Sequence, residues 1–454
     1  MQLQKYLILL VVVLAGSGCS KFLDKKPRSD IVEPASLSDV RAMLEIETHG
    51  VTPALPILSA DEYYYRSYAN LLQVTGTERN SYLWEKDVFA GETVRQDWQY
   101  PYIGIFYANN AMEAMEKMDS ASTPAGKVLR GWALFLRAHN MYNLVKCFAK
   151  IYDKNTASTD PGIPIKLKAA IDDIQPRASV QAVYDQILKD LLEARTLLPT
   201  TLPANRNQPS VMATDALLAR IGLTMQDYTM AERYADSCLS RYNKLIDYNG
   251  VSTSSAQPFV MNNDETLFAT TAVLAYSADK VLTNTFISID TVLLKMYNTN
   301  DIRGSVYYGK TGQYAILKRG YYGPSTFYPF TGIATDEVYL IKAECAARRE
   351  AVDVCLSYLN QLLVKRYRQN TFTPLTASGG SAALLLTLAE RRKELVWRGL
   401  RWDDLARLNK EGAEITLKRV VDGTTYTLAP NSPRYVFNIP ADEIALSGIA
   451  QNER

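Results

Sequence analysis

Residues 214–239, TDALLARIGLTMQDYTMAERYADSCL, decide the fold of this chain. Apolar residues recur there at the spacing of a helix, on both sides of Asp227 and Tyr228. Small Ala219 stands twelve residues before small Ala231. Small side chains at this spacing let two helices approach each other closely. The stretch therefore predicts a pair of helices with a break in the middle.

A second stretch has the same design. Residues 337–363, EVYLIKAECAARREAVDVCLSYLNQLL, place Ala343 twelve residues before Cys355. Residues 128–148 and 179–198 supply a third pair, and its second helix opens at a Ser N-cap and ends before Pro199. These features are typical of tetratricopeptide hairpins, which stack into a superhelix because each has an uncovered apolar face. The alternative is an unrelated helical bundle with coincidental spacing.

The rest of the chain predicts a mostly α protein with little β structure. Residues 382–408 continue the helical pattern, and the best strand-like alternation is over residues 426–439. Long stretches rich in Gly, Asn, Thr and Tyr lie between the helices, notably at 61–97, 251–264 and 298–331. Such loops usually carry function. We expect a tetratricopeptide-like helical-hairpin superhelix with long, irregular loops.

The N-terminus predicts export and lipid anchoring. Lys5 precedes an apolar run at 6–15, which is too short to span a bilayer core that needs ~20 helical residues. Small residues at 16–18 lead into Cys19, which is typical of a cleaved signal peptide. The pattern resembles the lipobox of bacterial lipoproteins, although Gly16 replaces the usual Leu. Residues 1–18 would be removed and Cys19 lipidated; an ordinary signal peptide before an incidental cysteine is the alternative.

Composition is that of a globular protein with a sizeable core, at 47% hydrophobic and 22% charged residues. The formal net charge of +2 falls to +1 without residues 1–18, which contain one Lys and no acidic residue. Near-neutral charge gives no support for nucleic-acid binding. Cys147, Cys238, Cys345 and Cys355 lack the spacing of a zinc site. Cys345 and Cys355 could pair in an oxidising compartment, or all four could be buried thiols.

Short motifs in a fixed order cover almost the whole chain. After Cys19, Ser20 to Asp24 is followed by Pro27, and Ser59 to Glu62 comes next. The later motifs are Trp98, Tyr102, Ile105, Ala108 and Asn109; Phe135 to Ala138; Tyr358 to Asn360 with Lys365 and Arg366; Glu390 to Leu395 with Gly399, Arg401, Asp404, Leu405 and Arg407; Phe437 to Glu443; and Gln451 with Asn452. In this order the motifs resemble the SusD/RagB family of surface lipoproteins, with Trp397 and Arg398 as a minor departure.

The resemblance implies an outer-membrane protein, lipid-anchored and facing the cell exterior, that captures a nutrient. The ligand would be a glycan, with a peptide as the alternative, and it would pass to a SusC-like TonB-dependent transporter. The tetratricopeptide side would face the transporter, and the loops would face the ligand. Residues 19–27 would be the tether, and 28–454 a single domain with helical pairs at about 127–242 and 335–408. The resemblance implies no cofactor, no metal and no catalysis.

Tyrosines in the long loops are the candidates for ligand contact. An aromatic face can cover the C–H-rich face of a sugar, and Tyr adds a polar tip. The chain has 29 Tyr, and many fall in the long loops. The predicted ligand-binding residues are Tyr65, Tyr68, Trp84, Tyr307, Tyr308, Tyr321 and Tyr322. Helical spacing assigns Trp98, Tyr102 and Phe106 to packing instead.

Two other classes of function compete with a nutrient binder. A surface glycoside hydrolase needs two carboxylates, but nothing in the sequence singles out a pair. His49 and His139 stand apart, and neither H-E-x-x-H nor G-x-S-x-G occurs. A scaffold lipoprotein would use the helical repeats alone. The charged block at 390–407 is expected to be structural: Glu390, Glu394 and Arg398 would form helix ion pairs, and Asp403 or Asp404 would pair with an Arg.

Overall fold

The computed structural model describes residues 34–454 except 93–94, 274, 278–284, 319 and 323–328. The predicted signal peptide, tether and lipidated Cys19 lie outside these residues and stay predictions, as do the domain boundaries. Helices dominate the described chain, and its sheets are short antiparallel strand pairs. The predicted mostly α fold is confirmed.

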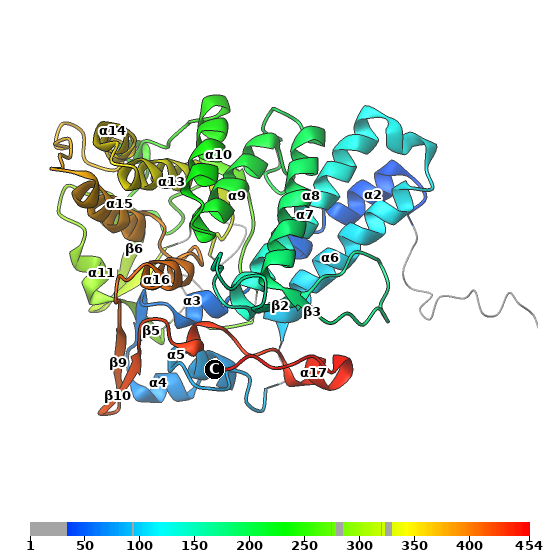
Figure 1. The fold of residues 1–454 in the computed structure, drawn as a ribbon. Helices are drawn as coiled ribbons and strands as arrows, with labels where there is room; N and C mark the ends of the chain where they lie inside the picture. Colours follow the sequence, from blue (N-terminus) through cyan, green and yellow to red (C-terminus); the bar gives the residue numbers. More distant parts are fainter. Residues whose placement is uncertain (1–33, 93–94, 274, 278–284, 319, 323–328) are drawn as a thin grey trace, which may run out of the picture.

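A row of long helices forms one side of the molecule (Figure 1). They are α6 Gln96–Met115, α7 Pro124–Phe148, α8 Val180–Leu197, α9 Val211–Thr224, α10 Tyr228–Arg241, α13 Thr335–Arg348, α14 Val352–Leu363 and α15 Gly380–Glu394. We call them the repeat half. Each of α6 to α10 packs on the next, and α10 packs on α13, which also contacts α14 and α15. The predicted pairs, α7 with α8, α9 with α10 and α13 with α14, are confirmed.

Local signals set the ends of these helices. The Ser179 side chain accepts a hydrogen bond from the backbone N–H of Ala182 and so caps α8, as predicted. Between α9 and α10, Gln226 adopts a φ of 60°, and Asp227 accepts from the N–H of Met230 at 2.8 Å. A Cβ on Gly222 would lie 2.7 Å from the backbone nitrogen of Ala231. The absence of a side chain at Gly222 therefore allows the close approach of the two helices.

Shorter elements pack along the other side and form what we call the loop half (Figure 1). Its helices are α3 Leu55–Ser59, α4 Tyr68–Leu72, α5 Gly76–Tyr82, α11 Thr291–Lys295, α12 Arg303–Val306, α16 Arg401–Lys410 and α17 Ala441–Ser447. Its strand pairs are β1 Tyr63–Tyr65 with β5 Ile287–Ile289, β6 Tyr308–Thr311 with β7 Tyr314–Leu317, and β9 Leu417–Val421 with β10 Thr424–Leu428. The remaining elements, α2 Leu37–Leu44 and the pairs β2 Pro161–Pro164 with β3 Arg177–Ser179 and β4 Thr266–Phe268 with β8 Ile333–Ala334, contact repeat-half helices.

Two sequence predictions about the loop half need correction. Residues 61–97 and 298–331 are not plain loops, because they contain β1, α4, α5, α12, β6 and β7. The strand predicted over 426–439 is also misplaced. A hairpin at 417–428 turns at Asp422 and Gly423, whose φ values are 48° and 75°, and a 3₁₀ turn occupies Pro433–Tyr435. The Asp-Gly pair is a strong hairpin signal, and it identifies the turn.

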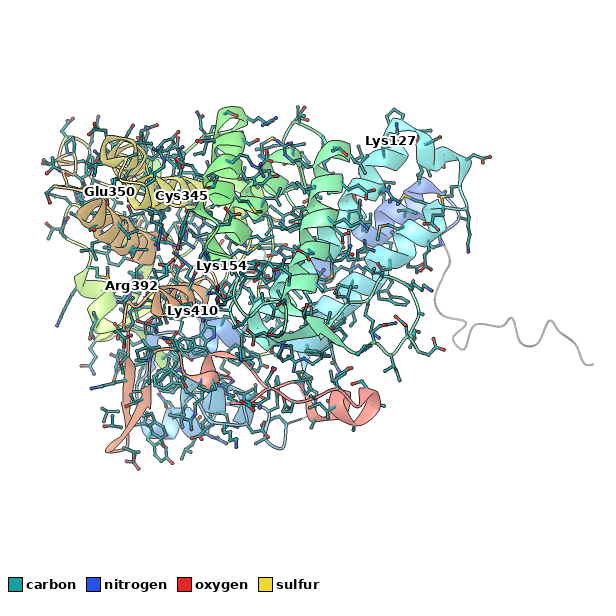
Figure 2. All side chains as sticks on the ribbon, in the orientation of Figure 1. Lys127, Lys154, Cys345, Glu350, Arg392 and Lys410 are labelled. Atoms are coloured by element: carbon teal, nitrogen blue, oxygen red, sulfur yellow. The ribbon has the colours of Figure 1, made fainter. Side chains whose placement is uncertain are left out.

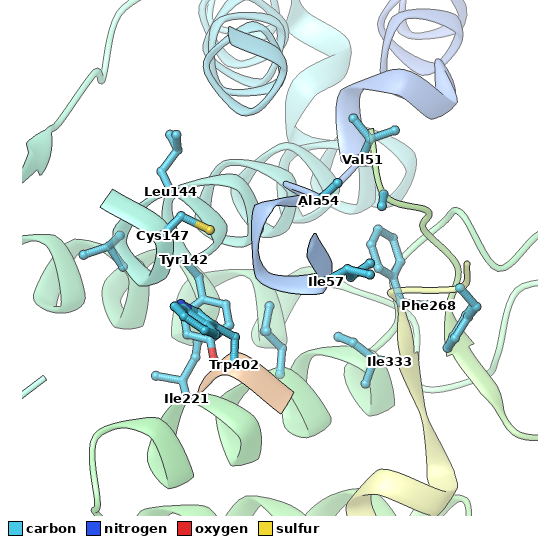
Figure 3. Close-up of a cluster of buried hydrophobic side chains, with 14 of the residues drawn as sticks. Val51, Ala54, Ile57, Tyr142, Leu144, Cys147, Ile221, Phe268, Ile333 and Trp402 are labelled. Carbon is cyan, nitrogen blue, oxygen red and sulfur yellow. The ribbon is translucent and has the colours of Figure 1, made fainter. Parts of the chain in front are cut away.

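One hydrophobic core runs through both halves. It includes Trp84 of the loop half and Leu217 of the repeat half. Figure 3 shows the part in which α3, α7, α9 and α16 meet the β4–β8 pair, with Ala54, Ile57, Tyr142, Cys147, Ile221, Phe268, Ile333 and Trp402 among the labelled side chains. The four cysteines from Cys147 onward are free and buried, so Cys345 and Cys355 do not form a disulfide.

Candidate ligand-binding site

The structure places the seven predicted ligand residues unequally. Tyr68 is 45% exposed at the start of α4. The other six are buried: Tyr65, Trp84, Tyr307, Tyr308, Tyr321 and Tyr322. Whether any of the seven touches a ligand stays a prediction. As the side chains lie here, Tyr68 alone among the seven presents a large ring surface to solvent.

Tyr65 and Trp84 belong to an aromatic cluster inside the loop half. The Tyr65 ring lies 4.7 Å from that of Tyr82, and its hydroxyl donates to Glu78 Oε1 at 2.7 Å. Trp84 donates its indole N–H to the carbonyl of Ser59 at 3.0 Å. The Arg419 guanidinium stacks over Trp84, 4.4 Å from the ring centroid. Both side chains therefore hold distant segments of the loop half together.

A second cluster surrounds Tyr248. Its hydroxyl lies 2.9 Å from that of Tyr307 and 2.7 Å from that of Tyr321. Tyr308 shares a hydrogen bond of 3.1 Å with Tyr297. Burial raises the pKa of Tyr322 to about 12. These hydroxyls have partners inside the protein, as buried tyrosines require.

A buried network of charges lies next to this second cluster. Its arginines come from α12 and from loops, and its acids come from α13, α15 and the segments before β4 and α12. Arg303 contacts Asp301, Glu390 and Glu394 at 2.7 to 2.9 Å. Arg366 contacts Glu265 and Glu394 at 2.7 Å each, and Arg398 contacts Asp336 at 2.6 Å. The structural role predicted for residues 390–407 is therefore confirmed.

The partners within that block differ from those predicted. Helix α15 ends at Glu394 with Leu395 as its C-cap, and beyond it Trp397 and Gly399 adopt positive φ angles of 58° and 67°. Arg398 therefore lies outside the helix and pairs with Asp336 rather than with Glu394. Asp404 pairs with Arg391 and Arg407, as predicted. Asp403 pairs with Lys146 of α7.

Three acids of the network could in principle hold a metal ion. Carboxylate oxygens of Glu265, Asp336 and Glu394 lie within 4.8 Å of one another. Burial raises the pKa of Glu265 to about 7. Burial also opposes ionisation of Glu394, but Arg366 and Arg303 outweigh it and lower its pKa to about 2. Each of the three acids already accepts from an arginine, so the donor set fits guanidinium groups better than a cation.

A group of exposed and half-buried side chains lies on or beside the other face of the β1–β5 pair. We call it the aromatic surface and define it as Tyr64, Arg66, Tyr68, Asn70 and Tyr314. Tyr63 and Tyr65 point into the core, and side chains alternate along a strand, so Tyr64 points outward. The Arg66 guanidinium lies 4.4 Å from the centroid of the Tyr314 ring, and its Nε donates to Ile287 O at 2.8 Å.

Sequence reasoning missed Tyr64 and Tyr314 as candidates. The sequence prediction selects Tyr65 over Tyr64, but Tyr63, Tyr64 and Tyr65 form a strand in which the middle ring faces away from its neighbours. The three tyrosines after the acidic pair at 61–62 give only a weak strand signal. Three residues are too few to show the two-residue alternation of a strand. Tyr314 stands beside Gly312, which has a positive φ of 59° in the turn between β6 and β7. Predicting a hairpin at this turn would have shown which side chains lie on each face of the hairpin.

Two hollows elsewhere in the described chain are larger than the cavity beside Tyr307 and Tyr321. One of about 630 Å³ lies between the end of α7, α16 and residues 431–453, with Trp402 and Lys410 on its walls. Lys410 is labelled in Figure 2 near the centre of the molecule. Another of about 640 Å³ lies between α10 and α13. A small cavity of about 40 Å³ touches Tyr307, Lys318 and Tyr321.

Both histidines lie in packed surroundings. His49 stacks on Tyr107 with ring centroids 4.2 Å apart, and burial lowers its pKa to about 4. Burial lowers the pKa of His139 to about 3. Within the described residues, no helix has the length and apolar character needed to cross a membrane.

Comparison with known proteins finds one matching family. Residues 21–223 match the SusD-like family described as "Starch-binding associating with outer membrane". Over these residues the chain is similar to the SusD-like family. No curated protein matches it.

Solved SusD-like structures have the same fold. A SusD superfamily protein from Bacteroides fragilis aligns with a TM-score of 0.75 at 19% identity, over 92% of this chain and 99% of that one. One from Bacteroides thetaiotaomicron aligns with a TM-score of 0.74 at 20% identity, over 92% and 100%. A laminarin-binding SusD-like protein aligns with a TM-score of 0.65 at 16% identity, over 91% and 98%. The resemblance expected from the sequence motifs is confirmed.

Proposed function

We propose that this SusD-like protein captures a glycan at the cell surface and delivers it to a SusC-like TonB-dependent transporter in the outer membrane. The observation that carries the proposal is the match of residues 21–223 to a family described as starch-binding and associated with the outer membrane. The laminarin-binding relative supports a polysaccharide or oligosaccharide as ligand. The predicted lipid on Cys19 would hold the protein at the membrane.

The aromatic surface has the chemistry that such a ligand needs. Tyr64 and Tyr314 are half-buried and Tyr68 is exposed, so part of each side chain packs on the protein and part is accessible to solvent. Aromatic faces pack on the C–H-rich faces of sugar rings. Arg66 and Asn70 lie among them and can bind hydroxyl groups. Asn70 donates to Phe286 O at 3.4 Å, and this contact ties α4 to the strand beside it.

The protein acts in this proposal as a binder and not as an enzyme. The acids of the charged network are buried and paired with arginines, and both histidines are packed in the core. A glycosidase would instead need two carboxylates that reach the scissile bond.

Binding can be tested by affinity electrophoresis in gels that contain laminarin, starch or other polysaccharides. Tyr314→Ala and Tyr68→Ala should each reduce retention on the polysaccharide that retards the parent protein, by a free energy of about 1 kcal/mol. Tyr426→Ala is the matched control, because Tyr426 is a half-buried tyrosine on the separate β9–β10 hairpin. Unchanged retention in both surface variants would place the ligand elsewhere.

Delivery and anchoring are tested separately. Cys19→Ala should release the protein from the membrane fraction, and a Cys19→Ala protein that stays membrane-bound would contradict the anchor. Purification from detergent-solubilised membranes should bring down a large TonB-dependent barrel. Recovery of the protein without a barrel would contradict delivery to a transporter. Glycan binding would still be tested by the gel assay.

A further inference from the structure

The hollow between the end of α7, α16 and residues 431–453 has the size of a ligand site and is open to solvent. Its volume is about 630 Å³, and small-molecule sites are clefts of roughly 300–1,000 Å³. Lys150, Pro161 and Pro433 on its walls are exposed, so a ligand can enter from solution. Every residue that lines the hollow belongs to the part of the chain that the structure describes.

Side-chain hydrogen bonds fix the C-terminal segment as one wall of the hollow. Gln451 donates to the carbonyl of Ile439 and accepts from its N–H, at 2.8 Å each. Asn452 donates to the carbonyls of Phe148 at 2.9 Å and of Phe437 at 2.8 Å. Phe148 is the last residue of α7, so these contacts tie the segment to that helix. The protein's own contacts therefore hold this wall in shape.

Two ion pairs supply polar groups to the hollow. Lys150 contacts Asp160 at 2.9 Å, and Lys410 contacts Asp153 at 2.5 Å. All four side chains line the hollow, with both lysines exposed and both aspartates half-buried. An ammonium has three donors and a carboxylate has about four acceptor sites. Each pair thus retains donors and acceptors for a ligand after its own contact is made.

The charges around the hollow nearly cancel. A third pair, Lys146 with Asp403 at 2.9 Å, is also on its wall, and Glu453 adds an exposed acid. Three lysines and four acids give a formal charge of 3 − 4 = −1. Because each lysine already contacts an aspartate, a charged ligand would compete with an existing pair. A neutral ligand that both donates and accepts hydrogen bonds needs no such exchange.

Apolar side chains occupy the wall between these polar groups. Those that are exposed or half-buried are Ile151, Pro161, Ala406 and Pro433. A sugar ring matches such a lining, since it has C–H groups on its faces and hydroxyl groups at its edge. A hydroxyl group donates one hydrogen bond and accepts others.

We propose that this hollow is a second glycan-binding site, which takes a short stretch of neutral sugar residues. No residue of the aromatic surface lines it. Sugar hydroxyls bind the unused N–H groups of the two exposed lysines and the unused oxygens of their aspartates, and both ion pairs stay intact. The inference rests on the proposed function, because two linked sites on one chain hold a polysaccharide more tightly than either site alone.

Ala406→Phe tests the site by filling it. Ala406 is half-buried on the face of α16 that lines the hollow, so a benzyl group there takes the space of the ligand. In gels with laminarin or starch, this variant should bind the polysaccharide that retards the parent protein at least about 10-fold more weakly, because one of two linked sites is lost. Ala382→Phe is the matched control, since Ala382 is a half-buried alanine of α15 outside the hollow.

A second variant avoids any disturbance of packing. Lys150→Ala removes an exposed side chain and its N–H donors, and it should also weaken retention. Lys154→Ala is its control, because Lys154 is exposed on the same loop and does not line the hollow. Figure 2 labels Lys154 and Lys410 in this part of the molecule. Thermal melts of all four variants without ligand show whether they are folded.

Equilibrium dialysis with a labelled trisaccharide of the same sugar counts the sites. The parent protein should bind two molecules per chain, and Ala406→Phe and Tyr314→Ala should each bind one. One molecule per parent chain, or parent-like retention of both folded Ala406→Phe and Lys150→Ala, would overturn the second site.

The remaining outcomes separate this inference from the proposed function. Loss of retention in Tyr314→Ala, with Ala406→Phe unchanged, would keep the function and overturn the second site. A peptide that binds in place of the trisaccharide and is lost in Ala406→Phe would overturn the assignment of the hollow to sugars. A parent protein that no polysaccharide retards would overturn the proposed function, and this inference with it.

Discussion

The repeat half and the loop half use different means to hold the chain. In most of the repeat half, neighbouring helices follow one another in the sequence, although α10 packs on the distant α13; contacts such as Gly222 against Ala231 join residues nine positions apart. In the loop half, Arg419 donates to the carbonyl of Ala60, and Trp84 donates to that of Ser59. The first half is thus built from local contacts, and the second from long-range contacts made by aromatic and arginine side chains.

This difference in construction determines which substitutions each half tolerates. A helical hairpin is one of several similar units, so a defect there disturbs one interface. A loop-half arginine or aromatic residue joins several distant segments, and its loss leaves buried polar groups without partners. The buried charge network lies where the halves meet, with Arg303 on α12 and Glu394 on α15. We therefore expect the largest effects at that junction.

Arg366→Met is predicted to have the largest effect, because it leaves Glu265 and Glu394 buried without this partner. Removal of one partner of a buried ion pair costs about 3–5 kcal/mol. Urea unfolding should show this loss of free energy of unfolding. Arg368→Met, two residues away and exposed, is the control and should change stability by less than about 0.5 kcal/mol. A small effect of Arg366→Met would show that the junction does not couple the two halves.

Trp84→Ala tests the loop half. It removes a side chain that is 1% exposed, and loss of a buried Trp costs about 3–5 kcal/mol, less if the site collapses. Because one hydrophobic core includes Trp84 and repeat-half residues, the melting temperature of a single transition should fall. Calorimetry provides the measurement. Two separate transitions, with only one shifted, would show that the halves unfold independently.

Gly222→Ala tests the repeat half and should cost about 1–3 kcal/mol, because its Cβ would lie 2.7 Å from the backbone of Ala231. Gly250→Ala is the control, since a Cβ there meets nothing within 4 Å. Urea unfolding compares the two variants. An effect as large as that of Trp84→Ala would remove the contrast between local and long-range construction.

The smallest of the predicted effects is the change in folding stability with pH. Burial raises the pKa of Glu265 from 4.5 to about 7, so the folded protein binds this proton more tightly than the unfolded chain does. Its contribution to stability is therefore fully present below pH 4.5 and is lost as the pH rises to about 7. Burial lowers the pKa values of His49 and His139, which act in the opposite direction over part of this range.

The contribution of Glu265 is consequently measured as a difference. Urea unfolding of the parent protein and of Glu265→Gln at pH 5 and pH 7.5 should show that the parent loses more stability than the variant as the pH rises. Identical pH dependence in the two proteins would mean that Glu265 does not carry the proton.

The repeat half could be predicted in detail because its signals are local. The Ser179 cap and Pro199 bracket α8, and the turn at Gln226 and Asp227 divides α9 from α10. Such signals act within one or two helical turns and need no knowledge of distant residues. The loop half was predicted less well. The Asp-Gly pair at 422–423 signals a hairpin turn in the sequence, but the strand prediction over residues 426–439 does not use it.

The aromatic site shows why position in a loop does not predict exposure. Tyr64 and Tyr65 are adjacent, yet Tyr65 is buried against Tyr82 and Tyr64 points away from the core. Trp84 is buried because residues 59–60 and Arg419 close over it from distant parts of the chain. Burial of a loop side chain depends on which segments fold onto it, and composition does not specify them.

The sequence by itself determined the helical periodicity, the hairpin breaks and the SusD-like motifs, because each depends on residues close together in the chain or on their fixed order. Only the tertiary structure decided which charges are compensated. Lys342 and Lys393 meet carboxylates, whereas Lys318 meets the carbonyls of Thr253 and Ser305. The partners of Lys342 are more than a hundred residues away in the chain. Pairing over such separations is set by packing of the whole fold, and among the described residues it gives Lys318 two carbonyl acceptors and no carboxylate.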